Sequence, residues 1–291
     1  MQELEDYRQA GQKLYNKLRL LTSPVAIKFI KDFSEIPEKA QRPSKLGQKL
    51  SLCQAFTMAR RWGAHVAMTY DDNICVTSSF VHQWEKLPLK DILMSQVKSG
   101  YHLDAEAEIK VQSLFQEMAT KENYEKIKDH KGFIASPLPR TIVIPDVILI
   151  YGDPAQMTHI IHSLSYEGKY LIHSNFIGFG ESCIKGTLVP FLTGEPQVVL
   201  PGTGDRILAL TKEEEMAFGL PGDMLFYLNE NLFKSGGPFN MGQPVRFLLG
   251  NLPERMGPPA WSYLKRRLKK AKKRKEKAKS TGSPGQLWRR R

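Results

Sequence analysis

The sequence predicts an α/β or α+β fold, in which a mixed sheet carries flanking helices and a basic C-terminal tail follows. Segments with apolar residues at helical spacing alternate with short β-branched runs. The 291 residues are 41% hydrophobic and 25% charged, which is typical of a globular protein. We expect residues 1–257 to form one large domain or two packed halves, and residues 258–291 to form a helical or flexible tail.

The N-terminal part of the chain predicts two helices and two strands. Apolar residues recur at helical spacing in residues 4–21, and residues 24–30 are β-branched and apolar, so we expect a helix followed by a strand. The polar residues 36–48 contain two prolines and predict a loop. A helix over residues 51–63 and a strand over residues 65–70 are expected to follow.

The middle of the chain predicts a helix over residues 104–120 and then a strand-to-helix unit. Residues 141–151 are the most apolar run and predict a buried strand. Asp153 suits the N-cap and Pro154 the first position of a helix that runs through Tyr166.

Two turns with glycine predict the remaining strands of the body. Residues 201–206 predict a tight turn before a strand at residues 207–210. Residues 219–223 predict another turn, before a strand at residues 224–228.

The net charge of +12 lies in the tail. From Lys265 to Arg291 the chain has 14 Lys and Arg and one acidic residue, whereas residues 1–264 have 28 basic and 29 acidic residues. Blocks of like charge are usually solvated, and this block also suits non-specific binding of a polyanion such as RNA, DNA or anionic lipid. We expect a solvated tail with such affinity rather than a dedicated partner.

The sequence predicts a cytoplasmic protein. No apolar run approaches the roughly 20 residues of a membrane span, and residues 1–15 carry charges where a signal peptide needs an apolar stretch. In a reducing compartment Cys53, Cys75 and Cys183 are better interpreted as free thiols or metal ligands than as a disulfide framework.

Each cysteine is predicted to lie at the start of an element. Cys53 opens a helix, Cys75 follows the acidic turn of residues 71–73, and Cys183 follows two closely spaced glycines. Helix N-termini lower thiol pKa values and stabilise anions, so thiolates there suit a metal or a cluster. Core packing is the competing interpretation, because free Cys is often buried and the spacing matches no paired zinc knuckle.

Several short stretches together resemble a known family. They are Cys53-Gln-Ala with Ala59-Arg60, Asp72-Asn-Ile-Cys75, Pro145-Asp146-Val, Gly152-Asp-Pro-Ala-Gln156, Glu181-Ser-Cys183, Gly204-Asp-Arg206 and Glu215-Met-Ala-Phe-Gly219-Leu-Pro221. In this order, over residues 14–249, they resemble the domain-of-unknown-function family number 169, which has no settled activity. Because its members carry cysteines in these three places, the resemblance implies that the cysteines share a site.

Three converging thiolates suit a [4Fe–4S] cluster with one iron left open, and an open iron can bind substrate and act as a Lewis acid. Zinc held by three Cys and one His is the alternative. Asp72, His173 and Glu181 are candidates for a fourth ligand or for proton transfer, although each also suits an ordinary structural role. No His has a defined relation to a thiol, which disfavours a cysteine nucleophile.

We also expect a small-molecule pocket near residues 152–156 and 178–183. Gln156 is a candidate ligand contact because it follows a buried strand, where ligands often bind in α/β sheets, and Arg206 is a second candidate. The glycine pairs match no phosphate-loop or dinucleotide fingerprint. The alternative function is a non-catalytic protein with packed cysteines that binds a small ligand or nucleic acid.

Overall fold

The computed structural model describes residues 2–84, 125–176, 178, 180–232, 234–235 and 259–280, with residues 104, 106–107 and 110. The chain divides into two compact units, Met1–Met241 and Gly242–Arg291. The boundary predicted between residues 257 and 258 falls next to residues outside this description and stays a prediction. The helix predicted over residues 104–120 lies largely outside the described residues.

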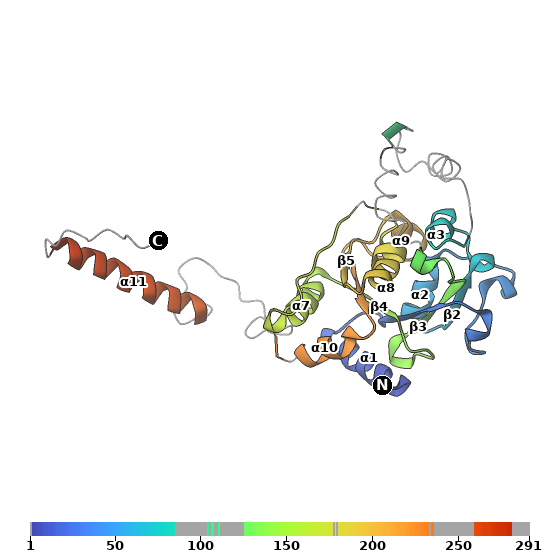
Figure 1. Cartoon of the computed structure of the whole chain (residues 1–291), viewed down its shortest axis with the longest axis horizontal. Coiled ribbons are helices and arrows are strands. Elements are labelled where there is room, and N and C mark those ends of the chain that lie inside the picture. Colours follow the sequence, from blue (N-terminus) through green and yellow to red (C-terminus); the bar gives the residue numbers. More distant parts are fainter. Residues whose placement is uncertain are drawn as a thin grey trace. The chain divides into compact units, whose positions relative to one another are not determined.

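The first unit is built on one sheet of six strands in the order β2-β3-β1-β4-β6-β5 (Figure 1). All pairs between these strands are antiparallel. The strands are β1 Val25–Ile30, β2 Val66–Thr69, β3 Gly132–Pro137, β4 Val147–Gly152, β5 Gln197–Val199 and β6 Met216–Pro221. The predicted class, a sheet with flanking helices, is confirmed, but the sheet is antiparallel throughout rather than mixed.

Helices cover both faces of this sheet (Figure 1). One apolar core joins the sheet to α1 (Leu4–Leu18), α7 (Pro154–Leu164) and α10 (Met224–Asn231). The core on the other face joins it to α2 (Leu52–Trp62), α3 (Val76–Val81), a π-helix (Glu181–Leu188) and α8 (Val189–Thr193). Successive side chains of a strand point to opposite faces of the sheet. Because helices cover both faces, every residue of β4 is buried.

The predicted start points of α2 and α7 are confirmed because both rest on local capping, whereas α7 ends at Leu164, before the predicted Tyr166. At the start of α2, the Gln54 side chain accepts a 2.9 Å hydrogen bond from the Ser51 backbone N–H, and Gly63 ends the helix in the left-handed region. Asp153 caps α7 by accepting a 2.8 Å hydrogen bond from the backbone N–H of Gln156.

Two predicted strands are wrong. Residues 203–208 form the helix α9 (Thr203–Leu208), where a strand was expected from residue 207, and residues 224–228 belong to α10. Leu225, Leu228 and Leu232 are buried at helical spacing, which a window of five residues cannot reveal. Strand β3 was not predicted, since its sequence Gly-Phe-Ile-Ala-Ser-Pro contains a single β-branched aliphatic residue.

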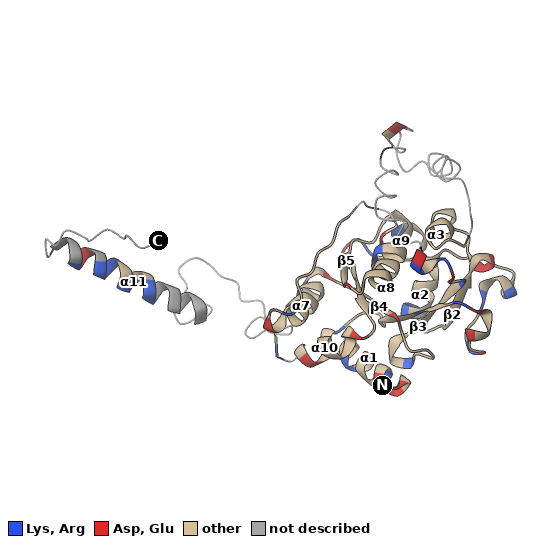
Figure 2. Ribbon diagram, viewed as in Figure 1, with Lys and Arg blue, Asp and Glu red and all other residues tan. Residues whose placement is uncertain are grey.

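The second unit contains the helix α11 (Pro259–Ser280), as expected for the basic tail. Figure 2 shows basic and acidic residues mixed over the first unit, whereas basic residues dominate α11. None of the helices that the structure describes combines the length and apolar character needed to cross a membrane.

Candidate functional site

The three cysteines lie at the starts of three helical elements on one face of the sheet. Cys53 is the second residue of α2, Cys75 is the N-cap of α3, and Cys183 is the third residue of the π-helix. The predicted positions at element starts are therefore confirmed. All three thiols are free and half-buried.

The structure brings these thiols into one region. The π-helix contacts both α2 and α3. Burial raises the pKa of the Cys183 thiol, and the charges of Cys75, Asp205 and Cys53 raise it further. Charges influence one another this way only at short range, so three cysteines that are far apart in the sequence share one electrostatic environment.

The thiols of Cys53 and Cys183 are not activated, contrary to the expectation that helix N-termini would lower their pKa values. Burial, the charge of Asp205 and the neighbouring Cys75 raise the pKa of Cys53 to about 12, although a hydrogen bond with Ser51 opposes this shift. The Ser51 Oγ to Cys53 Sγ distance is 3.0 Å. Desolvation outweighs the helix dipole because the dipole acts on partly buried groups by only about 1–2 kcal/mol. This environment disfavours a cysteine nucleophile at neutral pH.

A buried carboxyl group, Asp205 on α9, lies beside the thiols. The Cys53 thiol contacts the carbonyl oxygen of the adjacent Gly204 at 3.7 Å. Asp205 Oδ2 accepts a 3.2 Å hydrogen bond from the backbone N–H of Gly202. Burial raises the pKa of Asp205 to about 6, although Ser182 and Gly202 oppose this shift. Asp205 was not predicted as a site residue, although it stands between the glycine and the arginine of the Gly204-Asp-Arg206 stretch.

Two polar atoms at this place lack a well-formed hydrogen bond. Asp205 Oδ1 and Ser182 Oγ have no partner of normal geometry in the part of the chain that the structure describes. The Ser182 hydroxyl nevertheless helps to lower the pKa of Asp205, so their contact is a long or poorly aligned one. Buried polar atoms without partners are rare in folded proteins and commonly mark a place that a ligand or ion completes.

The π-helix lies directly on the sheet. A Cβ on Gly219 of β6 would come 2.4 Å from the carbonyl oxygen of Gly186, and a Cβ on Gly186 would come 2.7 Å from Leu149 Cδ1. The Cys183 carbonyl accepts a 2.7 Å hydrogen bond from Thr187 Oγ1, and His82 Nε2 lies 3.3 Å from it. π-Helices are rare and frequently occur at functional sites.

The family comparison agrees with the resemblance noted in the sequence. The family described as DUF169, "Uncharacterised ArCR", matches residues 13–231. The chain belongs to this family. An uncharacterized protein of Methanocaldococcus jannaschii, MJ0308, is 24% identical over 226 residues, which cover 77% of this chain and 92% of that protein. No solved structure matches the chain.

The DUF169 region thus contains all three cysteines and Asp205 but ends before α11. The family is uncharacterised, so the match itself names no activity. Any conclusion about function must therefore come from the side chains of the site.

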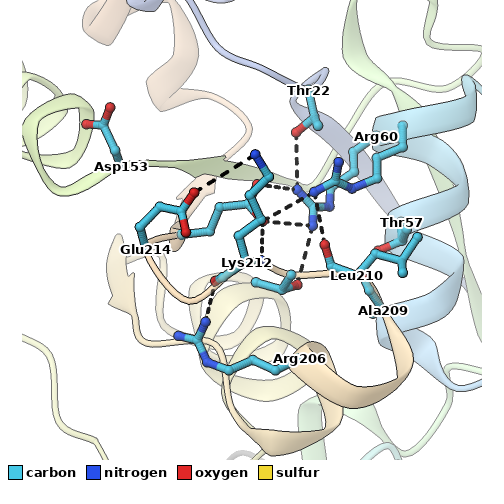
Figure 3. Close-up of polar contacts among 12 residues, drawn as sticks. Thr22, Thr57, Arg60, Asp153, Arg206, Ala209, Leu210, Lys212 and Glu214 are labelled. Atoms are coloured by element: carbon cyan, nitrogen blue, oxygen red, sulfur yellow. Dashed lines mark hydrogen bonds and ion pairs between the residues drawn. The ribbon is translucent and has the colours of Figure 1, made fainter.

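Arg60 anchors α2 beside the site. Its guanidinium lies 4.1 Å from the centre of the Tyr151 ring, and its Nη1 pairs with Glu215 Oε1 at 2.8 Å. Nη1 also donates to Thr22 Oγ1, as Figure 3 shows. Burial is the main cause of the raised pKa of Tyr151, and Asp205 and Cys53 contribute to it. Tyr151 therefore links the Arg60 pair to the thiol region.

Gln156, one of the two predicted ligand contacts, does not lie with the thiols. Gln156 Oε1 accepts a 2.7 Å hydrogen bond from the Asp153 backbone N–H, and Nε2 donates to the Leu18 carbonyl at 2.8 Å. Its helix α7 covers the opposite face of the sheet. Neighbouring strands of an antiparallel sheet have their carboxyl ends at opposite ends of the sheet. The rule that ligands bind beyond the carboxyl ends of the strands in α/β sheets, which pointed to Gln156, therefore does not apply here.

Arg206 follows Asp205 on α9, and its Nη1 donates to the carbonyl of Lys212 (Figure 3). The side chains of Arg206 and Gln156 both have hydrogen-bond partners within the protein, so neither needs a ligand as a partner. The ligand role of both residues therefore stays a prediction.

The candidates for a fourth ligand differ in environment. Asp72 is buried and already bound by Arg42 and by the Ser44 and Thr69 backbone N–H groups, at 3.0, 2.9 and 3.0 Å. Glu181 is buried, and its Oε1 accepts a 3.0 Å hydrogen bond from the Gly178 backbone N–H. His173 is exposed and lies in coil.

Proposed function

We propose that this is a cytosolic metalloprotein whose first unit binds a [4Fe–4S] cluster through Cys53, Cys75 and Cys183, with one open iron near a small-molecule site. The observation that carries the proposal is the shared region of the three thiols beside buried Asp205, where the charges of Cys75 and Asp205 act on both Cys53 and Cys183. Three thiolates and a carboxylate in one partly buried region repel one another, and a multivalent cation relieves that repulsion. Binding would release the thiol protons.

The described residues weigh against the zinc alternative. With Zn–S bonds of about 2.3 Å, two tetrahedral thiolate ligands stand about 3.8 Å apart. Among the described residues, no three His, Cys, Asp or Glu side chains form a group that could hold one metal ion. Thiols that bind different irons of a cluster stand farther apart than thiols that share one ion, and three cysteines leave one iron without a thiolate.

The residues around the thiols suit a ligand at such an open position. When bound, a cluster with an open iron supplies a Lewis acid. Asp205 Oδ1 and Ser182 Oγ supply acceptor atoms that make no well-formed hydrogen bond in the described structure. A protonated donor on a bound small molecule would satisfy them and would be held beside the thiols.

Anaerobic reconstitution with iron and sulfide tests the proposal. We expect about four iron and four sulfide per chain and an absorption band at about 400 nm, and we expect each Cys→Ser variant at positions 53, 75 and 183 to lose most of both. Met58→Leu, a change at a half-buried sulfur side chain on α2, is the matched control and should keep full cofactor content.

Two results would contradict the cluster. Colourless protein with stoichiometric zinc would support a three-Cys zinc site. Protein that takes up neither metal, with unchanged folding of the Cys→Ser variants, would support the alternative of packed cysteines in a protein that binds a small ligand or nucleic acid without catalysis.

We further propose that α11 binds polyanions without sequence preference. Eight of its described side chains are basic and exposed, at positions 266, 267, 269, 270, 272, 273, 274 and 277, against the single acidic residue Glu276. A helix with basic side chains around most of its circumference attracts phosphates by releasing their counterions.

Deleting residues 265–291 is therefore expected to abolish retention on heparin and binding to duplex DNA. Affinity of the full chain should fall with salt, with a slope of log K against log salt of about −0.9 for each phosphate neutralised. A full-length variant with the eight basic residues changed to Gln controls for chain length; it keeps six basic residues of the tail and should bind more weakly, with a smaller salt slope, than the full chain. Equal retention of all three proteins would rule out α11 as the binding segment.

A further inference from the structure

Basic side chains gather around His65, on the sheet face opposite the thiols. His65 directly precedes β2, and its Nδ1 lies 2.7 Å from Oγ of the buried Ser136 on β3. Ser136 alternates along β3 with Ala135, which belongs to the apolar core shared with α2, so Ser136 and His65 lie on the other face. The three cysteines lie on the face that α2, α3 and the π-helix cover. The group around His65 is therefore separate from the proposed cofactor site.

Two arginines are fixed beside His65 by contacts of their own. Arg140 follows β3, and a Cβ on Gly63, two residues before His65, would collide with Nη2 of Arg140. The Arg140 guanidinium therefore rests against the Gly63 backbone. Arg8 of α1 donates a 2.8 Å hydrogen bond from Nε to the carbonyl oxygen of Thr141, the residue after Arg140.

A lysine reaches the same place from the loop that precedes α2. Lys39 lies two residues before Gln41, whose backbone N–H donates a 2.8 Å hydrogen bond to the carbonyl oxygen of His65. Ala40 and Val143 pack against the same small apolar cluster on the sheet. These contacts bring the loop that carries Lys39 alongside the segment that follows β3.

The electrostatics of His65 agree with this arrangement. Partial burial is the main cause of its lowered pKa, and the charges of Arg140, Lys39 and Arg8 lower it further. All three charges are positive and repel one another. One of them is partly offset, since Arg8 Nη1 pairs with the exposed Glu5 at 3.2 Å. Lys39 and Arg140 are exposed, so an anion can reach the group from solvent and relieve the repulsion.

We propose that the phosphate group of a small molecule binds at a basic site formed by Arg8, Lys39, Arg140 and His65. The planar fork of the Arg140 guanidinium can donate to two phosphate oxygens at once, and the Lys39 ammonium adds a compact charge. Since Ser136 engages Nδ1 of His65, Nε2 is the ring nitrogen left to donate to a further oxygen. A phosphate dianion offsets more of the positive charge than a carboxylate does, which favours phosphate.

Titration of the full-length chain with inorganic phosphate, followed through the ring resonances of His65 by NMR, tests this site. The His65 signal is identified as the one that His65→Gln removes. At about pH 8 the imidazole is neutral and phosphate is mainly a dianion. At constant ionic strength, phosphate in place of chloride should shift the His65 signal saturably and leave that of the exposed His173 unchanged. Acetate should bind about tenfold more weakly.

Variants of the cations show whether the phosphate binds where we propose. Arg140→Gln should weaken phosphate binding by about tenfold, because it removes a charged hydrogen-bond donor. Lys39→Gln should weaken it severalfold, and this change of an exposed side chain decides the question if Arg140→Gln fails to fold. Lys45→Gln is the matched control and should keep the wild-type affinity, since Lys45 is exposed in the adjacent turn Pro43–Leu46 and is not among the charges that act on His65.

The site is overturned if phosphate shifts the His65 signal no more than chloride does, or if Arg140→Gln and Lys39→Gln both keep the wild-type affinity. An equal response to acetate would overturn the phosphate class. A shift that duplex DNA produces and inorganic phosphate does not would contradict the small-molecule site and assign these side chains to polyanion binding. None of these measurements depends on iron or zinc, so their outcome is independent of the cluster.

Discussion

Changing Arg60 to Met is expected to lower the free energy of unfolding by about 3–5 kcal/mol, because it leaves the Glu215 carboxylate buried without its main partner. The Arg60 side chain is fully buried and that of Glu215 is 6% exposed. Burial raises the pKa of Glu215, but the hydrogen bonds from Arg60 and from the Lys212 backbone outweigh it, so the net shift is downward. Urea unfolding at pH 7 measures the loss.

Arg61→Met is the matched control for this prediction. Arg61 also reaches Glu215, at 3.4 Å, but its side chain is 24% exposed, so its removal should cost less than about 1 kcal/mol. The double change Arg60→Met with Glu215→Gln should recover much of the loss, since no buried charge remains. Equal effects of the two arginine changes would show that the buried pair contributes no more than a surface pair.

The pH dependence of the Arg60→Met effect has a defined sign. A carboxyl group whose folded pKa is lowered contributes stability above its unfolded pKa of about 4.3, and this contribution is lost as pH falls through the folded value. The difference between wild type and Arg60→Met should therefore shrink below pH 4. A difference that stays constant down to pH 3 would assign the effect to lost packing instead.

Changing Asp205 to Asn is expected to stabilise the metal-free protein by up to about 3 kcal/mol at pH 7. Burial, the largest cause, raises the pKa of Asp205 to about 6, above its unfolded value. The folded state then holds the proton more tightly, so the contribution of this group is fully present below about pH 4 and is lost as pH rises through about 6. Wild type and Asp205→Asn should be similar at pH 4, diverge between about pH 4 and pH 6, and differ by a nearly constant amount above that.

Asp72→Asn supplies a control of opposite sign. Burial raises the pKa of Asp72, but hydrogen bonds from Ser44, Thr69 and Arg42 outweigh burial, and the net shift is downward. Asp72→Asn should therefore destabilise the protein at pH 7, although both aspartates are buried. Destabilisation by Asp205→Asn at pH 7 would show that its carboxylate is satisfied in the metal-free protein. A stabilising change that also reduces iron uptake would indicate that the buried charge is kept for the cofactor.

Local sequence signals were sufficient where the chain's own neighbours determine the structure. The caps at Ser51 and Asp153 involve residues three positions apart, so α2 and α7 could be predicted with their start points. The same holds for the cysteines, each of which stands within a few residues of the start of its element. The separation of charge between body and tail is a property of composition and needs no fold.

Elements whose identity depends on distant partners could not be predicted in this way. Strand β3 has weak β-propensity but lies between β2 and β1, which supply its hydrogen bonds on both sides. The leucines of α10 fit a short apolar strand as well as a helix until the sheet face that buries them is known. Tertiary packing overrides local propensity in both cases.

The sequence by itself determined the sheet-and-helix class, the basic α11 and the three cysteines at element starts, because these depend on residue type and on spacings of a few positions. Only the tertiary structure decided that thiols far apart along the chain share one region with the buried Asp205. Burial and the approach of distant charges set those properties, and both arise only when the helices cover the sheet.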